Sequence, residues 1–181
     1  AAANSQRFLA YCLTLADRHD EAIAAGRKAE KDLVALLGER HYLVAFTRAC
    51  LAYALAHRDR LDEALTLSGN AIELADRSPS INPDQHAHII AARGLVLAKA
   101  RKHAQALAAF DRVWPLAYER SPTAFPWRIA VIRDALAAAA ALEDTNAIAA
   151  WSARFDPFAV PQTATDDSTQ VEAETSTPKP R

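Results

Sequence analysis

The fold is decided by residues 50–65, which read CLAYALAHRDRLDEAL. Nearly the same pattern stands 42 positions earlier, where residues 8–23 read FLAYCLTLADRHDEAI. Both ends of the stretch share this offset, and two landmarks with one period indicate an internal repeat. The second landmark returns at the same offset at residues 104–107, and more weakly after a further step of 41 at residues 145–148. The sequence therefore predicts four copies of one structural unit.

Each unit contains two amphipathic segments joined by a short polar turn. In the second unit, apolar residues recur three and four positions apart on both sides of residues 57–60, HRDR. This spacing places them on one face of a helix, and a short turn makes the two helices antiparallel neighbours. The predicted helices are 4–16, 20–37, 42–57, 61–77, 84–100, 104–119, 126–141 and 145–155.

Composition and boundary residues agree with helix throughout. Alanine, the best helix former, provides 43 of the 181 residues, whereas glycine provides 4. Asn82 before Pro83 is typical of a helix start, and Gly38 of a helix end. Pro115 lies inside a helical pattern, where we expect a kink or an early break. The fold class is therefore all-α.

Two regions follow from this pattern. Residues 1–160 form one helical repeat domain, with units at about 4–40, 42–80, 84–122 and 126–156. Residues 161–181 hold seven Ser or Thr, four acidic residues and three prolines, with Val171 as the one large aliphatic residue. This composition buries too little apolar surface to offset ordering, so it predicts a disordered tail. The tail is either an inert terminus or a segment for phosphorylation or partner binding.

The chain begins with Ala1 and contains no methionine. Two explanations are open: removal of an initiator methionine, or a C-terminal piece of a longer protein. We expect the second, because the first helix starts with almost no lead-in.

The repeat resembles the tetratricopeptide family, which places small and bulky residues at fixed positions of a helical hairpin. The matching residues are Leu9, Ala10, Leu13, Ala22 and Ala29 in the first unit, Leu51, Ala52, Leu55, Ala64 and Ala71 in the second, Gly94, Leu97, Ala106 and Phe110 in the third, and Ala135, Ala147 and Trp151 in the fourth. Small residues let paired helices approach closely. Arg93 and Asp134 depart from the pattern, because leucine is usual at both positions.

The family's usual repeat has a period of about 34 positions, so the longer unit resembles its kinesin-light-chain-like subclass, which bacteria often append to signalling proteins. The resemblance implies a right-handed α-solenoid of about four stacked hairpins.

The resemblance also implies a binding groove on the concave face, lined by the first helix of each unit. Its expected partner-binding residues are Arg7, Tyr11, Thr14, Phe46, Tyr53, His88 and Leu95. Tyr11 and Tyr53 stand one repeat period apart and should line the same surface, either for a partner or as packing between units. Only Asn4 and Arg7 resemble the family's carboxylate clamp, so we do not expect one.

Arg48 and Arg93 lie in otherwise apolar stretches of first helices. An arginine there could pair with Asp134 or with an acidic group of a ligand, and the alternatives are another internal ion pair or a solvated edge.

Several function classes are not expected. The net charge of −1 disfavours nucleic acid and anionic lipid as partners, and no apolar run approaches the length of a membrane span. The sequence contains no phosphate-binding glycine loop, nucleophile elbow or Cys-x-x-Cys motif, so we expect neither an enzyme nor a cofactor. His86 and His88 are two positions apart, which points them in different directions on a helix, so no metal site is expected.

Two cysteines, Cys12 and Cys50, are typical of a reducing compartment, so we expect a cytoplasmic location with both as small core residues.

The expected function is a protein–protein interaction module that binds a peptide or partner protein, with self-association also open. The alternative is a C-terminal regulatory or sensor domain of a larger bacterial signalling protein, such as a serine/threonine kinase or a transcription regulator. A third possibility is a structural role, in which Trp151, Phe155 and Phe158 cover the last hairpin.

Overall fold

The computed structural model describes residues 2–117 and 127–154. Phe155, Phe158 and the predicted tail lie outside the described residues. The helices in these two stretches agree closely with the predicted boundaries. They are α1 (Ala2–Leu15), α2 (His19–Leu37), α3 (Tyr42–Ala56), α4 (Leu61–Asp76), α5 (Pro83–Lys99), α6 (His103–Ala117), α7 (Arg128–Ala141) and α8 (Thr145–Arg154).

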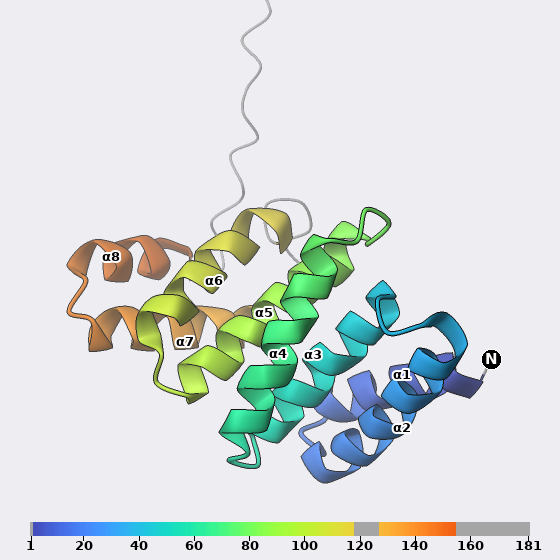
Figure 1. Ribbon diagram of the computed structural model, residues 1–181. Helices are drawn as coiled ribbons and strands as arrows, with labels where there is room; N and C mark the ends of the chain where they lie inside the picture. Colours follow the sequence, from blue (N-terminus) through green and yellow to red (C-terminus); the bar gives the residue numbers. More distant parts are fainter. Residues whose placement is uncertain (1, 118–126, 155–181) are drawn as a thin grey trace, which may run out of the picture.

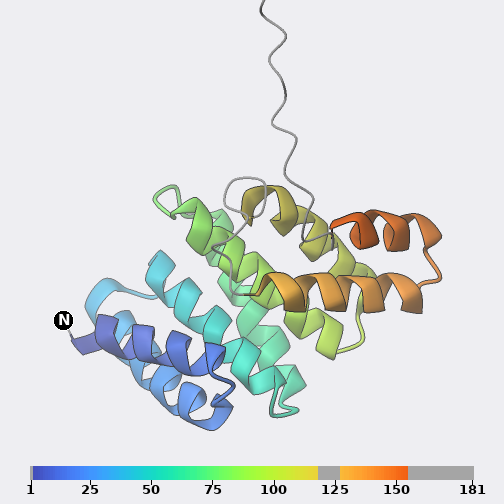
Figure 2. The same cartoon turned by 180° about the vertical axis from the view of Figure 1, so that it is seen from behind.

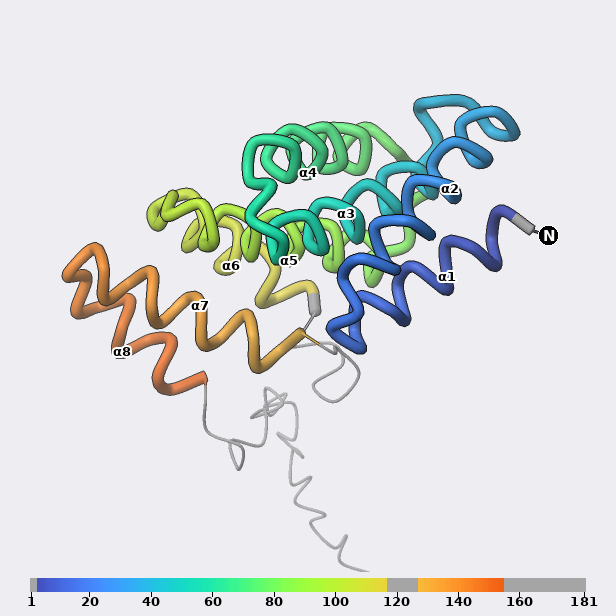
Figure 3. The backbone as a smooth tube through the Cα atoms, turned by 90° about the horizontal axis from the view of Figure 1, so that it is seen from below, coloured from blue at the N-terminus to red at the C-terminus, as the bar shows by residue number. Residues whose placement is uncertain are grey.

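The helices pack in sequential pairs, α1 with α2 through α7 with α8, and each pair packs on the next. The first helices, α1, α3, α5 and α7, contact one another in chain order, whereas α2, α4 and α6 each contact the first helix that follows. The first and last pairs form the two ends of the array (Figures 1 and 2). In Figure 3, α1 and α7 lie on one side of α3 and α5, and α4 lies on the other. The predicted all-α stack of helical hairpins is confirmed.

The turn inside each hairpin repeats with a constant period. Within residues 2–117 and 127–154, four residues other than glycine have positive φ angles between 55° and 58°: Asp17, Asp59, Arg101 and Glu143. After each of them, the next amide donates back five positions along the chain, as Arg18 does to the Leu13 carbonyl at 3.0 Å and Asp144 to the Ala139 carbonyl at 3.0 Å. This is the Schellman arrangement that ends a helix.

The period corrects the predicted offset of the fourth unit. The left-handed residues are 42 positions apart at every step, so the last unit follows at this same offset and not at 41. Ile148, rather than Ala147, therefore stands where Ala22, Ala64 and Ala106 stand. The predicted offset of 41 depended on aligning Ala147 with Ala106. One matching alanine carries little information in an alanine-rich chain.

The boundary signals also have structural counterparts. The Asn82 side chain accepts a hydrogen bond from the Asp84 amide at 2.8 Å, and Gly38 ends α2 with a φ of 83°. The sequence did not reveal His41, whose Nδ1 accepts from the Leu43 amide at 3.2 Å and begins α3. Helix α6 continues through Pro115 to Ala117, so the predicted early break does not occur within the described residues.

Small residues bring the paired helices together, as predicted. Ala10, Ala52, Ala64 and Ala106 are all buried. At Gly94, a β-carbon would lie 2.5 Å from Cε1 of Phe110, so only glycine fits beside that ring.

Cys50 is a core residue, but the prediction for Cys12 is wrong, because Cys12 is exposed on α1. In the part of the chain that the structure describes, none of the helices has the length and apolar character needed to cross a membrane.

Candidate functional site

An aromatic cluster gathers on the first-helix side of the array from all four units. We call it the aromatic face, and it consists of Tyr11, Phe46, Tyr53, His88 and Trp127. The Tyr11 ring lies 5.6 Å from that of Phe46, 5.7 Å from that of His88 and 6.4 Å from that of Trp127. Trp127 stacks on Tyr53 with ring centroids 5.1 Å apart. Side chains from the first and last units of the chain thus meet on one surface.

A hydrogen bond fixes the centre of the aromatic face. The Tyr11 hydroxyl lies 3.0 Å from Nε2 of His88, and Nδ1 of His88 lies 2.7 Å from the Asp84 carbonyl oxygen. A carbonyl only accepts, so Nδ1 carries the proton and Nε2 accepts from Tyr11 when the imidazole is neutral. Burial lowers the pKa of His88, which favours this neutral form, and raises the pKa of Tyr11 to about 12.

The structure places the seven predicted partner-binding residues at different depths. Tyr11 and His88 are half-buried, and the rest are buried: Arg7, Thr14, Phe46, Tyr53 and Leu95. Thr14 donates its hydroxyl proton to the Ala10 carbonyl at 2.7 Å within its own helix. The aromatic face is thus filled by its own side chains, and Tyr11 and His88 provide its accessible polar groups.

Arg7 is an unusual member of this region. Its guanidinium donates to Oδ1 of Asn4 at 3.1 and 3.0 Å and lies over the rings of Phe8 and Phe46. No carboxylate of the described residues pairs with Arg7, and burial lowers its pKa. An amide oxygen and two aromatic faces therefore replace the usual counterion.

A second cluster of aromatic side chains lies at the turn end of the first two units. The analysis of the repeat did not predict it. His19 stacks on His57 with ring centroids 4.3 Å apart, and the Tyr53 ring lies 4.6 Å from that of His57. Burial, followed by the charges of Lys99 and His19, lowers the pKa of His57 to about 4. These imidazoles are held neutral near pH 7.

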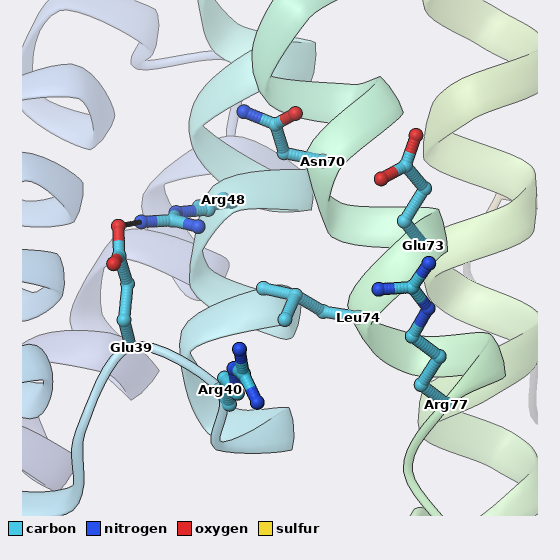
Figure 4. Close-up of a pocket in the computed structure, with 7 residues that line it drawn as sticks. All are labelled: Glu39, Arg40, Arg48, Asn70, Glu73, Leu74 and Arg77. Carbon is cyan, nitrogen blue, oxygen red and sulfur yellow. Dashed lines mark hydrogen bonds and ion pairs between the residues drawn. The ribbon is translucent and has the colours of Figure 1, made fainter.

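The outer side of the array carries a polar cavity of about 270 Å³ between the α2–α3 loop, α3 and α4. Figure 4 shows its lining residues, Glu39, Arg40, Arg48, Asn70, Glu73, Leu74 and Arg77. Arg48 pairs with Glu30 at 2.6 Å and with Glu39 at 3.3 Å, so its role in an internal ion pair is confirmed. The lining holds three arginines against two glutamates, so it presents no strong charge of one sign.

Neither Arg48 nor Arg93 pairs with Asp134 in the described part of the chain. Arg93 reaches across to α4, where Nη1 donates to the Leu65 carbonyl and to the Ser68 hydroxyl, both at 2.8 Å. Asp134 instead accepts from its neighbour Arg133 at 2.7 Å. Arg93 therefore joins the second and third units through neutral acceptors.

Aromatic rings of α6 and α8 pack together where the last two hairpins meet, as part of the main core. Trp151 is buried, with its ring 6.3 Å from that of Phe110 and 5.3 Å from that of Trp114. Arg154 lies over both tryptophan rings. Trp151 thus packs between the last two hairpins, whereas the suggested cover by Phe155 and Phe158 lies outside the described residues.

Within the described ranges, no three His, Cys, Asp or Glu side chains come together in a way that could hold a metal ion. A scan against protein-family models and a search of curated proteins found no match for this chain.

Proposed function

We propose that this chain is a protein-interaction module of the tetratricopeptide type, a right-handed array whose first helices bind a peptide or a helix of a partner protein. The observation that carries the proposal is the aromatic face. Four repeat units direct Tyr11, Tyr53, His88 and Trp127 to one surface, on the side where the first helices contact one another.

The chemistry of the aromatic face suits a protein partner. Aromatic rings with polar tips are enriched at protein interfaces, because they bury much area with few rotatable bonds. The Tyr11 hydroxyl and His88 imidazole satisfy each other in the free chain, so the face is ordered before a partner arrives. We infer that a partner packs apolar side chains against Tyr11 and His88 and reaches the exposed Asn4 at the rim.

The test compares two double variants. Tyr11→Ala with His88→Ala alters the aromatic face, whereas Arg112→Ala with Asp76→Ala removes an exposed ion pair between α6 and α4. Both variants should keep the wild-type helical content and a cooperative melting transition. Proteins retained from a lysate of the source organism are quantified by mass spectrometry, and each candidate is then titrated as a purified protein.

The proposal predicts a purified partner that binds wild type and the Arg112/Asp76 variant equally, and the Tyr11/His88 variant at least tenfold more weakly. It is overturned if no retained protein binds in titration, or if the partner distinguishes only the Arg112/Asp76 variant.

A further inference from the structure

A cavity of about 240 Å³ lies between α5, α6 and α7. Lys99, His103 and Arg133 each reach it from a different one of these helices. Asp134 is the one carboxylate in the lining, and it accepts from Arg133 at 2.7 Å. The small side chains of the remaining lining residues leave the space unfilled, and these are Ala98, Ala137 and Ala138.

The turn beside this cavity concentrates positive charge. Residues 98–105 read AKARKHAQ and hold three cations, Lys99, Arg101 and Lys102, and no acidic residue. The corresponding stretches of the other units all hold acidic residues, and they read TLADRHDE at 14–21, AHRDRLDE at 56–63 and AALEDTNA at 140–147. With Arg133, the cavity and its turn therefore present four cations against one paired carboxylate.

The fold does not neutralise the cations of the third turn. In the first turn Arg18 pairs with Glu21 at 2.5 Å, and in the second Arg60 pairs with Glu63. Among the described residues, no carboxylate forms an ion pair with any of the three cations in the α5–α6 turn. The charge of this turn is therefore available to a ligand.

This charge does not serve the stability of α6. The start of a helix is its positive end and favours acidic residues. Helices α2 and α4 each begin with an Asp-Glu pair, whereas α6 has no acid in its first turn and directly follows Arg101 and Lys102. The positions of these two cations therefore indicate a role other than stabilising the helix.

The imidazole of His103 is a separate indication of a ligand. Its Nδ1 is buried and has no hydrogen-bond partner in the part of the chain that the structure describes. A buried nitrogen without a partner destabilises the free chain. Because His103 lines the cavity, a change of its side-chain rotamer would let Nδ1 donate to an anion there.

We propose that this cavity binds a phosphate group, carried by a small molecule or by a phosphorylated side chain. A phosphate monoester has a charge of about −1.5 to −2 at pH 7 and three oxygens that accept hydrogen bonds. These oxygens can meet donors on Lys99, His103 and Arg133 from three sides. A carboxylate has less charge and two oxygens in one plane, so it suits a three-sided site less well. The aromatic face is not part of this cavity, so phosphate binding and partner binding are tested separately.

The experiment titrates the full chain with sodium phosphate at constant ionic strength and follows the backbone amides by NMR. Saturable shifts should centre on the cavity, and sodium chloride at the same ionic strength should not produce them. Lys99→Ala with Arg133→Ala should weaken phosphate binding at least tenfold. The control is Arg27→Ala with Lys28→Ala, which removes the same charge from exposed positions of α2 and should bind as wild type does. Both variants should keep the wild-type helical content.

A short peptide with one phosphoserine among neutral residues distinguishes the two sources of the group. Tighter binding than that of inorganic phosphate supports a phosphorylated side chain, and binding no tighter supports a small molecule. The proposal is overturned if sodium chloride gives the same shifts, if the shifts do not saturate, or if the Lys99/Arg133 variant binds phosphate as wild type does.

Discussion

The first and second units carry almost the same motif in opposite environments. Residues 8–11 and 50–53 differ only in Phe8 against Cys50, yet Leu9 is 47% exposed and Leu51 is 2% exposed. The difference arises from the neighbouring unit, because α2 covers α3 while no described element covers the same side of α1. In a stacked array, the place of a unit in the stack decides how deeply a residue is buried.

The largest expected effect separates these two leucines. Leu51→Ala should lower the free energy of unfolding by about 2–5 kcal/mol, because it leaves a cavity between α2 and α3. Leu9→Ala should change it by about 0.5 kcal/mol or less in the monomer, because much of its side chain is already in water. Urea denaturation at low protein concentration measures both. Equal losses would show that the first unit is covered like the second.

The repeat could be read from the sequence because the residues that define it are local. The small side chains of Ala22 and Ala64 and the polar turns before them are required by contacts within one hairpin. These contacts recur in each copy of the unit. The depth of Leu9 or Cys12 depends on a contact between units, which the motif itself does not encode. This explains why Cys12 was expected in the core and lies exposed.

Two glycines give the next comparison, between a close helix contact and a looser one. A β-carbon at Gly94 would lie 2.5 Å from Phe110, which is fully buried and cannot move aside, so Gly94→Ala should destabilise the fold by about 1–3 kcal/mol. At Gly26 the nearest atom, in Leu51, would be 3.5 Å away, an ordinary contact. Gly26→Ala should therefore stabilise by about 0.5–1 kcal/mol through helix propensity.

Thermal and urea unfolding of both variants should give shifts of opposite sign. A loss at Gly26 equal to that at Gly94 would mean that α2 and α3 pack as closely as α5 and α6.

The aromatic face was only partly accessible to sequence reasoning. Tyr11, Phe46, Tyr53 and His88 lie together as their repeat positions suggested, because first helices share one side of the array. The cover that Trp127 gives to Tyr11, Tyr53 and His88 could not be foreseen. The corresponding positions in the third and second units hold Gln85 and Leu43, so no periodic signal marks that tryptophan.

The histidines at the turn end of the first two units should make the stability of the fold depend on pH. The folded pKa of His57 is lowered from 6.5 to about 4, so the unfolded chain binds its proton first as the pH falls. Stability should therefore decrease between about pH 6.5 and pH 4. The groups facing His57 are His19, Lys99, Asp17 and Asp134, and the pKa of His19 is also lowered, mainly by burial.

His57→Asn should make this decrease shallower while leaving stability at pH 7.5 nearly unchanged. The measurement is urea unfolding at half-unit steps of pH. An identical slope in the variant would show that His57 titrates normally in the fold. Part of the slope should remain, because His19 and His88 also have lowered pKa values.

The smallest effects should distinguish the four hairpin turns. Arg101 and Glu143 adopt left-handed conformations that an L-residue with a β-carbon disfavours, whereas aspartate tolerates them better at Asp17 and Asp59. Arg101→Gly should therefore stabilise by about 0.5–1 kcal/mol, and Asp59→Gly by less. Lys102→Gly is the control, because Lys102 lacks a positive φ and glycine there only adds freedom to the unfolded chain. If Arg101→Gly and Lys102→Gly destabilise alike, the left-handed conformation of Arg101 costs no stability.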